Sequence, residues 1–331
     1  MPTLARRQLL AALAAAPFAV RAAALEKFTV AGWSKPITEI TPLLVDEDKG
    51  FYRAQGLALE YVPGAGSADA LRNILGGQAD VAFCDPGTFF AALDKGAALR
   101  AIYDIYPRNV FNIVSLKGSG IAKPSDLKGK KVGVYSLASG TRQALQVLLH
   151  TAGLSETDVT VVVTGVLNFA PLMQGQVDAT AATDTGLLVG RRRGLPAVDV
   201  MEVGQYLPVS SDLFVVREET YRAKRVLLQR FLRGYADAAA WMMQRPEEAA
   251  QIAAKRAIDG TDPALNLDII KLRNAASVSE LTRHNGLGAM DVASLQAAAD
   301  AYRKLGLISK PLDVRQYVSQ DLLPGRKGEP A

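Results

Sequence analysis

Cysteine and histidine are scarce in this chain of 331 residues. The single cysteine, Cys84, cannot form an internal disulfide, so packing must supply the stability. The two histidines, His150 and His284, lie far apart and have no partner at metal-ligand spacing. The sequence therefore predicts neither a metal site nor another cofactor.

Long apolar runs are missing beyond the N-terminal segment. Residues 1–24 combine a basic start, an apolar run over 9–20 and small residues at Ala22 and Ala24. This pattern is typical of a cleaved secretory signal and is too short to span a bilayer comfortably. Paired arginines near the start leave the export route open between the general secretory and the twin-arginine pathway. We expect residues 25–331 to be exported and soluble.

A strong charge of one sign is also missing. The whole chain has 38 Lys and Arg residues against 33 Asp and Glu residues. Residues 1–24 hold three of the arginines and no acid, so the remainder has a balance of 35 against 33, or +2. This near-neutral balance gives no reason to expect a nucleic-acid partner. The remaining 307 of the 331 residues are enough for two domains, and 49% hydrophobic content is ordinary for a globular α/β protein.

Strand and helix patterns alternate through the first third of the chain, which predicts a parallel sheet with its site at the carboxyl ends of the strands. Pro86 can open a helix that Asp85 caps. The expected strands are 27–33, 57–62 and 79–84, and the expected helices are 36–52 and 67–77.

The second third repeats this plan. The sequence Gly-Gln-x-Asp occurs at 77–80 and again at 175–178, each time where a helix gives way to a strand. Duplication or convergent architecture would explain the repeat, and either predicts two similar lobes. The expected strands here are 130–136, 158–163 and 177–183, and the expected helices are 141–152 and 169–174.

The last third is predominantly helical. After a strand at 213–216, five residues at helical spacing predict a long helix with one face in the core. Segments 103–114 and 206–214 are the candidate crossings between lobes, and the tail 324–331 is expected to be disordered. The five residues are Leu227, Phe231, Tyr235, Ala238 and Met242.

Three stretches carry a family resemblance: "GFYRAQGL" (50–57), "GQAD" (77–80) and "DLKGKKV" (126–132). With the secretory signal, they resemble the periplasmic substrate-binding proteins of ABC importers, in the SsuA/THI5-like (NMT1-like) group. The resemblance implies a two-lobed, type II-like periplasmic-binding-protein fold in which each lobe has a mostly parallel sheet flanked by helices. It places lobe I at 25–108 plus 210–331 and lobe II at 109–209, joined by two hinge crossings.

The same resemblance implies the working of the protein. A monomer in the periplasm would close on a small solute and deliver it to an ABC transporter permease with its ATPase. Such a protein binds without catalysis. A THI5-like pyrimidine synthase would need its own reactive histidine and a cysteine-rich motif, and a hydrolase would need Ser139 in a G-x-S-x-G motif; both patterns are missing. A transcriptional regulator would need a DNA-binding helix pair where the export signal lies.

The candidate ligand-binding residues lie in the loops that follow strands. Trp33 could stack on the ligand, whereas the helix start at 139–141 offers hydroxyl and N–H groups to an anion. Cys84 is expected to be a packed thiol. The full set is Trp33, Ser34, Asp85, Pro86, Gly87, Thr88, Ser139, Gly140, Thr141, Arg142, Asp184 and Ser211.

These residues leave two ligand classes open. Arg142 and the open helix end favour an oxyanion-bearing solute, and a sulfonate-like organic anion is the preferred prediction. Trp33 together with Asp85 and Asp184 would instead suit an aminopyrimidine of the thiamine-precursor type.

Overall fold

The structure is a computed structural model that describes residues 24–165 and 169–325. The expected signal segment lies outside the described residues except for Ala24, and so does the expected disordered tail except for 324–325. None of the helices in the described ranges is long and apolar enough to cross a membrane.

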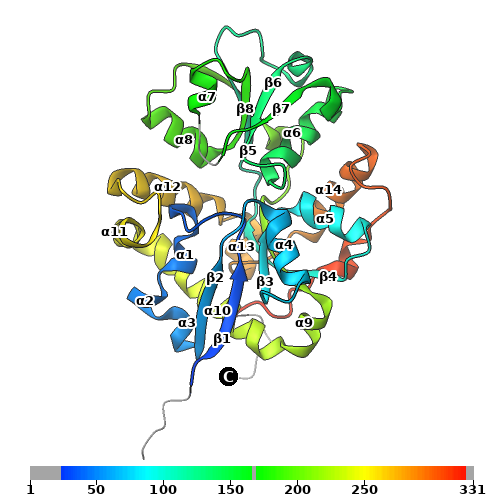
Figure 1. Cartoon of the computed structure of the whole chain (residues 1–331). Coiled ribbons are helices and arrows are strands. Elements are labelled where there is room, and N and C mark those ends of the chain that lie inside the picture. Colours follow the sequence, from blue (N-terminus) through cyan, green and yellow to red (C-terminus); the bar gives the residue numbers. More distant parts are fainter. Residues whose placement is uncertain (1–23, 166–168, 326–331) are drawn as a thin grey trace, which may run out of the picture.

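Two five-stranded sheets form the centres of two lobes, one above the other in Figure 1. In lobe I the strand order is β2-β1-β3-β10-β4, and in lobe II it is β7-β6-β8-β5-β9. β10 and β5 each run antiparallel to both neighbours, whereas the three strands before them in each order are parallel. The strands are β1 (Glu26–Ala31), β2 (Leu57–Val62), β3 (Val81–Cys84), β4 (Leu99–Tyr106), β5 (Phe111–Leu116), β6 (Lys131–Val134), β7 (Thr160–Val163), β8 (Ala179–Thr183), β9 (Val198–Glu202) and β10 (Asp212–Arg217).

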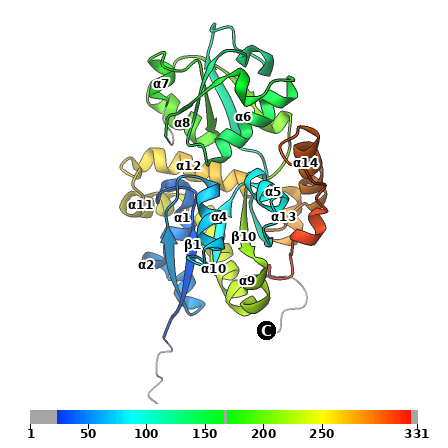
Figure 2. The same ribbon diagram turned by 45° about the vertical axis from the view of Figure 1, so that its right-hand side comes forward.

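Helices cover both sheets, and the last third of the chain is helical as predicted (Figures 1 and 2). α12 lies at the boundary between the lobes and contacts α8 of lobe II. The α-helices are α1 (Thr41–Leu44), α2 (Asp46–Lys49), α3 (Phe51–Ala54), α4 (Ser67–Leu75), α5 (Pro86–Asp94), α6 (Gly140–Thr151), α7 (Ala170–Met173), α8 (Asp184–Arg192), α9 (Glu218–Ala223), α10 (Arg225–Gln244), α11 (Pro246–Arg256), α12 (Pro263–Ala276), α13 (Glu280–Asn285) and α14 (Val292–Lys304). The 3-10 turns are η1 (Thr38–Ile40), η2 (Pro124–Leu127), η3 (Glu156–Asp158), η4 (Val203–Gln205) and η5 (Val314–Tyr317).

The expected single helix over 36–52 is wrong, because this segment is divided into η1, α1, α2 and α3. Pro42 lies in the first turn of α1 and lacks the N–H that would continue a preceding helix. Gly50, at φ +73°, ends α2 in the left-handed region. The predicted stripe of α10 is confirmed, since all five of its residues are buried.

The chain crosses between the sheets twice, over 107–110 and over 203–211. Ser211 joins the two crossings: its hydroxyl donates to the carbonyl of Arg108 at 2.6 Å and accepts the N–H of Val110 at 2.8 Å. Its own N–H donates to the carbonyl of Tyr106 at 2.9 Å. Ser211 is therefore committed to the hinge, and the lobe boundaries at 108/109 and 209/210 stay a prediction.

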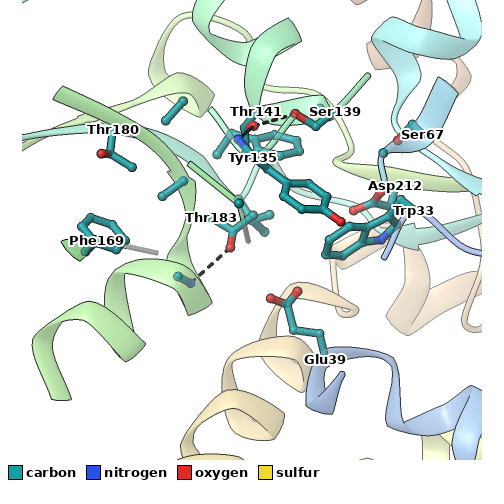
Figure 3. Close-up of a pocket in the computed structure, with 18 of the residues that line it drawn as sticks. Trp33, Glu39, Ser67, Tyr135, Ser139, Thr141, Phe169, Thr180, Thr183 and Asp212 are labelled. Carbon is teal, nitrogen blue, oxygen red and sulfur yellow. Dashed lines mark hydrogen bonds between the residues drawn. The ribbon is translucent and has the colours of Figure 1, made fainter. Parts of the chain in front are cut away.

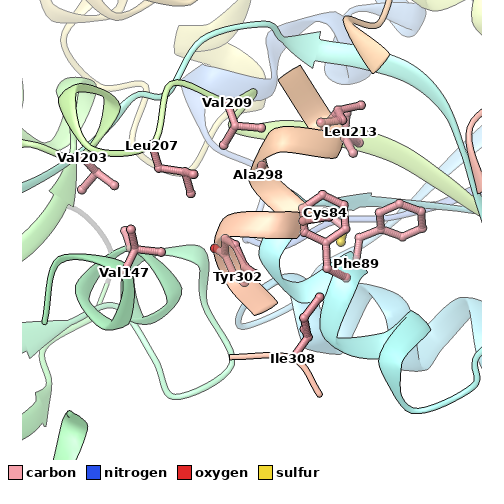
Figure 4. Close-up of a cluster of buried hydrophobic side chains, with 14 of the residues drawn as sticks. Cys84, Phe89, Val147, Val203, Leu207, Val209, Leu213, Ala298, Tyr302 and Ile308 are labelled. Carbon is pink, nitrogen blue, oxygen red and sulfur yellow. The ribbon is translucent and has the colours of Figure 1, made fainter. Parts of the chain in front are cut away.

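A hydrophobic cluster continues across the crossings on the side of α6 and α14 (Figure 4). Val147 of α6 faces Tyr302 of α14, with Leu207 of the second crossing beside them. Cys84 belongs to the same cluster as a buried free thiol, as predicted. The cluster gives the two lobes a common core behind the hinge.

The repeated Gly-Gln-x-Asp sequence has the same role in both lobes. In lobe I the Asp80 carboxylate accepts the N–H of Thr29 at 2.9 Å, and the Asp80 N–H donates to the Thr29 carbonyl at 2.9 Å. In lobe II the Asp178 carboxylate and N–H make the same pair of bonds with Lys131, at 2.7 and 2.8 Å. Each aspartate therefore fastens the turn before the central strand of its sheet, β3 or β8, to the neighbouring parallel strand, β1 or β6.

Replacement of either aspartate by alanine should destabilise the protein. Asp80→Ala loses a part-buried charge-assisted hydrogen bond and Asp178→Ala an exposed one, so each should lower the free energy of unfolding in urea titrations, by about 1–3 kcal/mol for Asp80 and about 1 kcal/mol for Asp178. Glu219→Ala is the control, because that side chain is 80% exposed. A loss confined to one lobe would contradict the common role.

Asp104 of β4 lies next to the second crossing and is buried. The Ser210 hydroxyl donates to one carboxyl oxygen at 2.6 Å, and the other oxygen has no hydrogen-bond partner in the described part of the chain. Burial, with a smaller contribution from Asp291, raises the pKa of Asp104 to about 8.

A raised pKa makes stability depend on pH with a defined sign. The folded protein holds the Asp104 proton to a higher pH than the unfolded chain does, so the free energy of unfolding should fall as pH rises from about 4 to about 8. Asp104→Asn keeps an oxygen for Ser210 and removes this titration. The variant should gain more than about 1 kcal/mol over the wild type at pH ~9 relative to pH ~5 in urea titrations. Parallel pH profiles would contradict the assignment.

Candidate ligand-binding site

A cavity lies between the two lobes and is lined by residues of both (Figure 3). Its volume, including the opening to solvent, is about 670 Å³. The lobes touch around it: the N–H of Ala68 in lobe I donates to the carbonyl of Ala138 in lobe II at 3.2 Å. The lining residues include Trp33, Glu39, Ser67, Phe111, Tyr135, Ser139, Gly140, Thr141, Phe169, Thr180, Thr183, Asp212 and Arg273.

Aromatic side chains from both lobes meet at one end of the cavity. Trp33 follows β1, and Tyr135 follows β6. Their ring centroids are 6.3 Å apart at an interplanar angle of 79°. The indole N–H of Trp33 is buried and has no hydrogen-bond partner in the described ranges. This wall can therefore contact a flat ligand and donate one hydrogen bond to it.

The start of α6 forms a second wall of the cavity. The hydroxyls of Ser139 and Thr141 in this wall make hydrogen bonds within the loop before α6. The Ser139 hydroxyl donates to the carbonyl of Ser136 at 2.7 Å and lies 2.8 Å from the hydroxyl of Thr141. The Thr141 hydroxyl accepts the N–H of Tyr135 at 3.0 Å. These bonds fix the shape of the loop and bring the amino end of α6 to the cavity.

Asp212, the first residue of β10, provides an acidic group beside Trp33 (Figure 3). It is 7% exposed, and no protein group in the described part of the chain hydrogen-bonds its carboxyl. Burial, and after it the neighbouring carboxyls of Asp85, Glu39 and Asp104, raise its pKa well above the ordinary value. The carboxyl is therefore free to pair with a ligand, and a ligand N–H would satisfy it.

Arg273 of α12 brings a buried cation to the same cavity. It is 1% exposed, its guanidinium lies 4.9 Å from the ring centroid of Tyr106, and its Nε is 3.8 Å from Oε2 of Glu39. Its Nη2 pairs with Asp184 at the start of α8. Glu39 also accepts the hydroxyl of Thr185. These contacts join the lobes and match the Arg273 charge with carboxylates of the protein itself.

Four of the twelve predicted ligand residues line the cavity: Trp33, Ser139, Gly140 and Thr141. The other eight are held elsewhere. Asp85 caps α5 through the N–H and hydroxyl of Thr88, at 2.8 and 2.7 Å. Pro86 and Gly87 face a smaller cavity between α5 and α6.

Arg142 is directed away from the cavity. Its guanidinium pairs with both oxygens of Glu156 at 2.7 and 2.8 Å, and the pairing raises the pKa of Arg142. Its second contact is the carbonyl of Leu137 at 3.0 Å. The predicted counter-ion for an anionic ligand is thus engaged by the protein.

The remaining predicted residues have structural partners too. The fully buried Ser34 donates its hydroxyl to the carbonyl of Lys35 at 2.8 Å. Asp184 pairs with Arg273, and Ser211 holds the crossings together. In the structure they do not meet at the cavity with Trp33.

Sequence reasoning missed Glu39, Tyr135, Asp212 and Arg273. Asp212 directly adjoins the predicted Ser211, and Tyr135 lies at the end of the expected strand 130–136, four positions before the predicted Ser139. Glu39 lies in a 3-10 turn and Arg273 in the middle of a helix. Nothing in their local sequence marks them.

The histidines and the cysteine lie apart from the cavity lining. His150 is in the last turn of α6, His284 in α13, and Cys84 in the lobe I core. Among the described residues, no three His, Cys, Asp or Glu side chains are arranged to hold a metal ion.

The sequence is similar to those of several known proteins, including two that match most of the chain. Riboflavin-binding protein RibY of Chloroflexus aurantiacus is 24% identical over 319 residues, 95% of this chain and 91% of the relative. A putative thiamine biosynthesis protein of Haemophilus influenzae is 25% identical over 83% of this chain and 86% of its own. The 4-amino-5-hydroxymethyl-2-methylpyrimidine phosphate synthase of Schizosaccharomyces pombe is 27% identical over 41% of this chain and 39% of its own.

Among solved structures, the alkanesulfonate-binding protein SsuA from Xanthomonas axonopodis pv. citri bound to MOPS has the same fold. It superposes with a TM-score of 0.70 at 20% identity, over 89% of this chain and 98% of that chain. The model of the family described as NMT1/THI5 like matches residues 37–249, which is more than half of the chain. The expected resemblance is confirmed: the protein belongs to the NMT1/THI5-like family and has the periplasmic-binding-protein fold.

Proposed function

We propose that the protein is an extracytoplasmic solute-binding protein that encloses a flat nitrogen heterocycle of the aminopyrimidine type. It would then deliver this solute to the permease of an ABC importer. The observation that carries the proposal is the unpaired carboxyl of Asp212 beside the unpaired indole N–H of Trp33.

The two groups complement the edge of an aminopyrimidine. Such a ring has an exocyclic amine that donates and ring nitrogens that accept. Asp212 can accept the amine N–H, and in its protonated form it can also donate to a ring nitrogen. Trp33 can donate to a further acceptor. A buried polar group costs free energy when it is unpaired, so this cavity favours a ligand that supplies these partners.

Hydrogen bonds alone would not hold the ligand. Micromolar affinity corresponds to about 8 kcal/mol, whereas a hydrogen bond to a charged group contributes about 1.5–3 kcal/mol. The rest must come from burial of the ring against Trp33, Tyr135 and Phe111, which line the cavity together. A flat aromatic solute gains more from these walls than a small aliphatic anion does.

The charged side chains that line the cavity also favour an aminopyrimidine over a sulfonate. Glu39 and Asp212 are acidic, and the cation in the wall, Arg273, already faces Glu39 and Asp184. A sulfonate would have to compete with these carboxylates and would lie near the carboxyl of Asp212. The expected preference for a sulfonate-like anion is therefore replaced in this proposal by its alternative.

A sulfonate nevertheless remains the second candidate. The amino end of α6, with Ser139, Gly140 and Thr141, lines the cavity and suits an anionic group. The structural relative SsuA is described as an alkanesulfonate-binding protein. The two candidates differ in the sign of the charge that the site should prefer, so they can be separated by experiment.

A binding role agrees better with the residues than a synthase role does. The pyrimidine phosphate synthase relatives match only part of this chain, 41% for that of Schizosaccharomyces pombe and 63% for that of Aspergillus parasiticus. A synthase that consumes its own histidine needs that residue at the ligand, whereas His150 and His284 both lie away from the cavity lining. Periplasmic location, export by residues 1–24, a monomeric state and delivery to a permease belong to this proposal and rest on the family.

Ligand class can be tested by thermal unfolding of residues 25–331 with a solute panel. The panel holds an aminopyrimidine, riboflavin, an alkanesulfonate and nitrate. A ligand at about a thousand times its dissociation constant should stabilise the protein by about 4 kcal/mol, which is a clear shift in Tm. We expect the shift with the aminopyrimidine, and recovery of the solute unchanged. A shift with the sulfonate alone would reverse the assignment.

Two substitutions of Asp212 separate the effect of its hydrogen bonds to the ligand from the effect of its charge. Asp212→Asn keeps one donor and one acceptor at the ring edge, so aminopyrimidine affinity should stay within about threefold. Asp212→Leu removes both groups and should weaken binding by at least about tenfold, or about 1.4 kcal/mol in calorimetry.

The same variants give the opposite result if the ligand is an anion. Removal of an acidic side chain from the cavity should then strengthen sulfonate binding in both variants. Arg142→Gln is the matched control, because Arg142 pairs with Glu156 outside the cavity lining. It should leave the affinity for either ligand unchanged.

A further inference from the structure

Helices α8 of lobe II and α12 of lobe I carry complementary charges where they meet (Figure 1). Asp184, the first residue of α8, pairs with Arg273 of α12. Arg192, the last residue of α8, pairs with Asp268 of α12. The acid belongs to α8 in one pair and to α12 in the other, so a reversed alignment of the helices would bring like charges together. We call these four residues the α8–α12 clasp.

The two pairs of the clasp differ in their exposure to water. The inner pair includes Arg273, which is 1% exposed, so loss of Asp184 would leave a buried cation with less compensation. The outer pair includes Arg192, whose side chain is 55% exposed, and water screens its attraction to Asp268. Movement of lobe II away from lobe I would break both pairs.

The lobes also touch on the other side of the cavity, where the loop before α6 meets the loop before α4. The Ser136 hydroxyl donates to the carbonyl of Ala65, and the N–H of Ala68 donates to the carbonyl of Ala138 at 3.2 Å. A Cβ at Gly66 would lie 2.3 Å from the Ala138 carbonyl oxygen, so this contact requires glycine. The facing surfaces of the two lobes therefore fit each other closely.

We infer that the α8–α12 clasp holds the lobes closed before a solute is bound, so that a solute enters only after the clasp has opened. Each contact described above joins two groups of the protein itself. Asp184, Arg192 and Asp268 lie outside the cavity lining, so their pairing does not depend on what the cavity holds. This inference concerns the regulation of the site and rests on the proposed function wherever a solute is used.

A clasp of this kind has a kinetic signature. It stabilises the closed form equally with and without a solute, so a weaker clasp should raise the association and dissociation rates by the same factor. The dissociation constant should then stay unchanged as long as the ligand-free protein remains mostly closed. A residue that stabilised only the solute complex would instead change the dissociation constant.

Small-angle X-ray scattering tests closure without any solute. The profile of the ligand-free wild type should match the one calculated from the closed structure. Asp184→Asn removes the negative charge beside the buried Arg273, so this variant should open and have a larger radius of gyration. An open profile for the ligand-free wild type would overturn the inference.

Charge reversal at the exposed pair tests the clasp with little risk to folding. Arg192→Asp places two acids together and should raise both rates for 4-amino-5-hydroxymethyl-2-methylpyrimidine by about fivefold at an unchanged dissociation constant. Stopped-flow tryptophan fluorescence can follow binding, because Trp33 lines the cavity. The double variant Arg192→Asp, Asp268→Arg should restore the wild-type rates. Arg193→Gln is the matched control, since this exposed neighbour lies outside the clasp and should leave both rates unchanged.

The outcomes separate the clasp from the proposed function. Unchanged rates in Arg192→Asp, a rise in dissociation alone, or a double variant that fails to restore the rates would each count against the clasp. If the aminopyrimidine does not bind to the wild type, the proposed function fails, and the scattering of the ligand-free protein still decides whether the clasp closes the lobes.

Discussion

The burial of the Arg273 guanidinium between the lobes is the constraint on which the arrangement of the site depends. A cation that is 1% exposed needs carboxylates to replace its water. Glu39 of lobe I is beside it, and Asp184 of lobe II completes the pair when the lobes are in contact. Contact between the lobes and neutralisation of this charge therefore go together in this structure. The bond from Thr185 to Glu39 strengthens the same junction.

This junction also determines what the cavity can recognise. The Arg273 cation faces carboxylates of the protein, although its Nε and Nη2 have no hydrogen-bond partner in the described residues. The carboxyl of Asp212 and the indole N–H of Trp33 also lack a partner there and belong to residues that line the cavity. In the proposed function, their combination favours a neutral or weakly basic ring with donors and acceptors at its edges over a compact anion. The same charged residues, Arg273 with Glu39 and Asp184, thus join the lobes and influence which ligand the cavity accepts.

The parts that could be predicted from the sequence have local causes. Apolar periodicity located most strands and helices, and the repeated Gly-Gln-x-Asp sequence marked equivalent junctions in both lobes. Trp33 and the loop before α6 were found because parallel strands end at one edge of a sheet. Arg273 and Glu39 could not be found, since distant packing brings α12 and η1 to the cavity. Residue type does not reveal the direction of a side chain: Arg142, predicted at the ligand, pairs with Glu156 in the structure.

The two sheets share one plan, but the residues that begin their antiparallel strands differ. β5 starts directly after the first crossing with Phe111, and β10 starts directly after the second with Asp212. Both side chains line the cavity, one as an aromatic ring and the other as a carboxyl. Two sheets of similar topology thereby contribute different side chains, one aromatic and one acidic, to the cavity near the hinge. A solute with one hydrogen-bonding edge and one apolar face would complement both kinds of side chain.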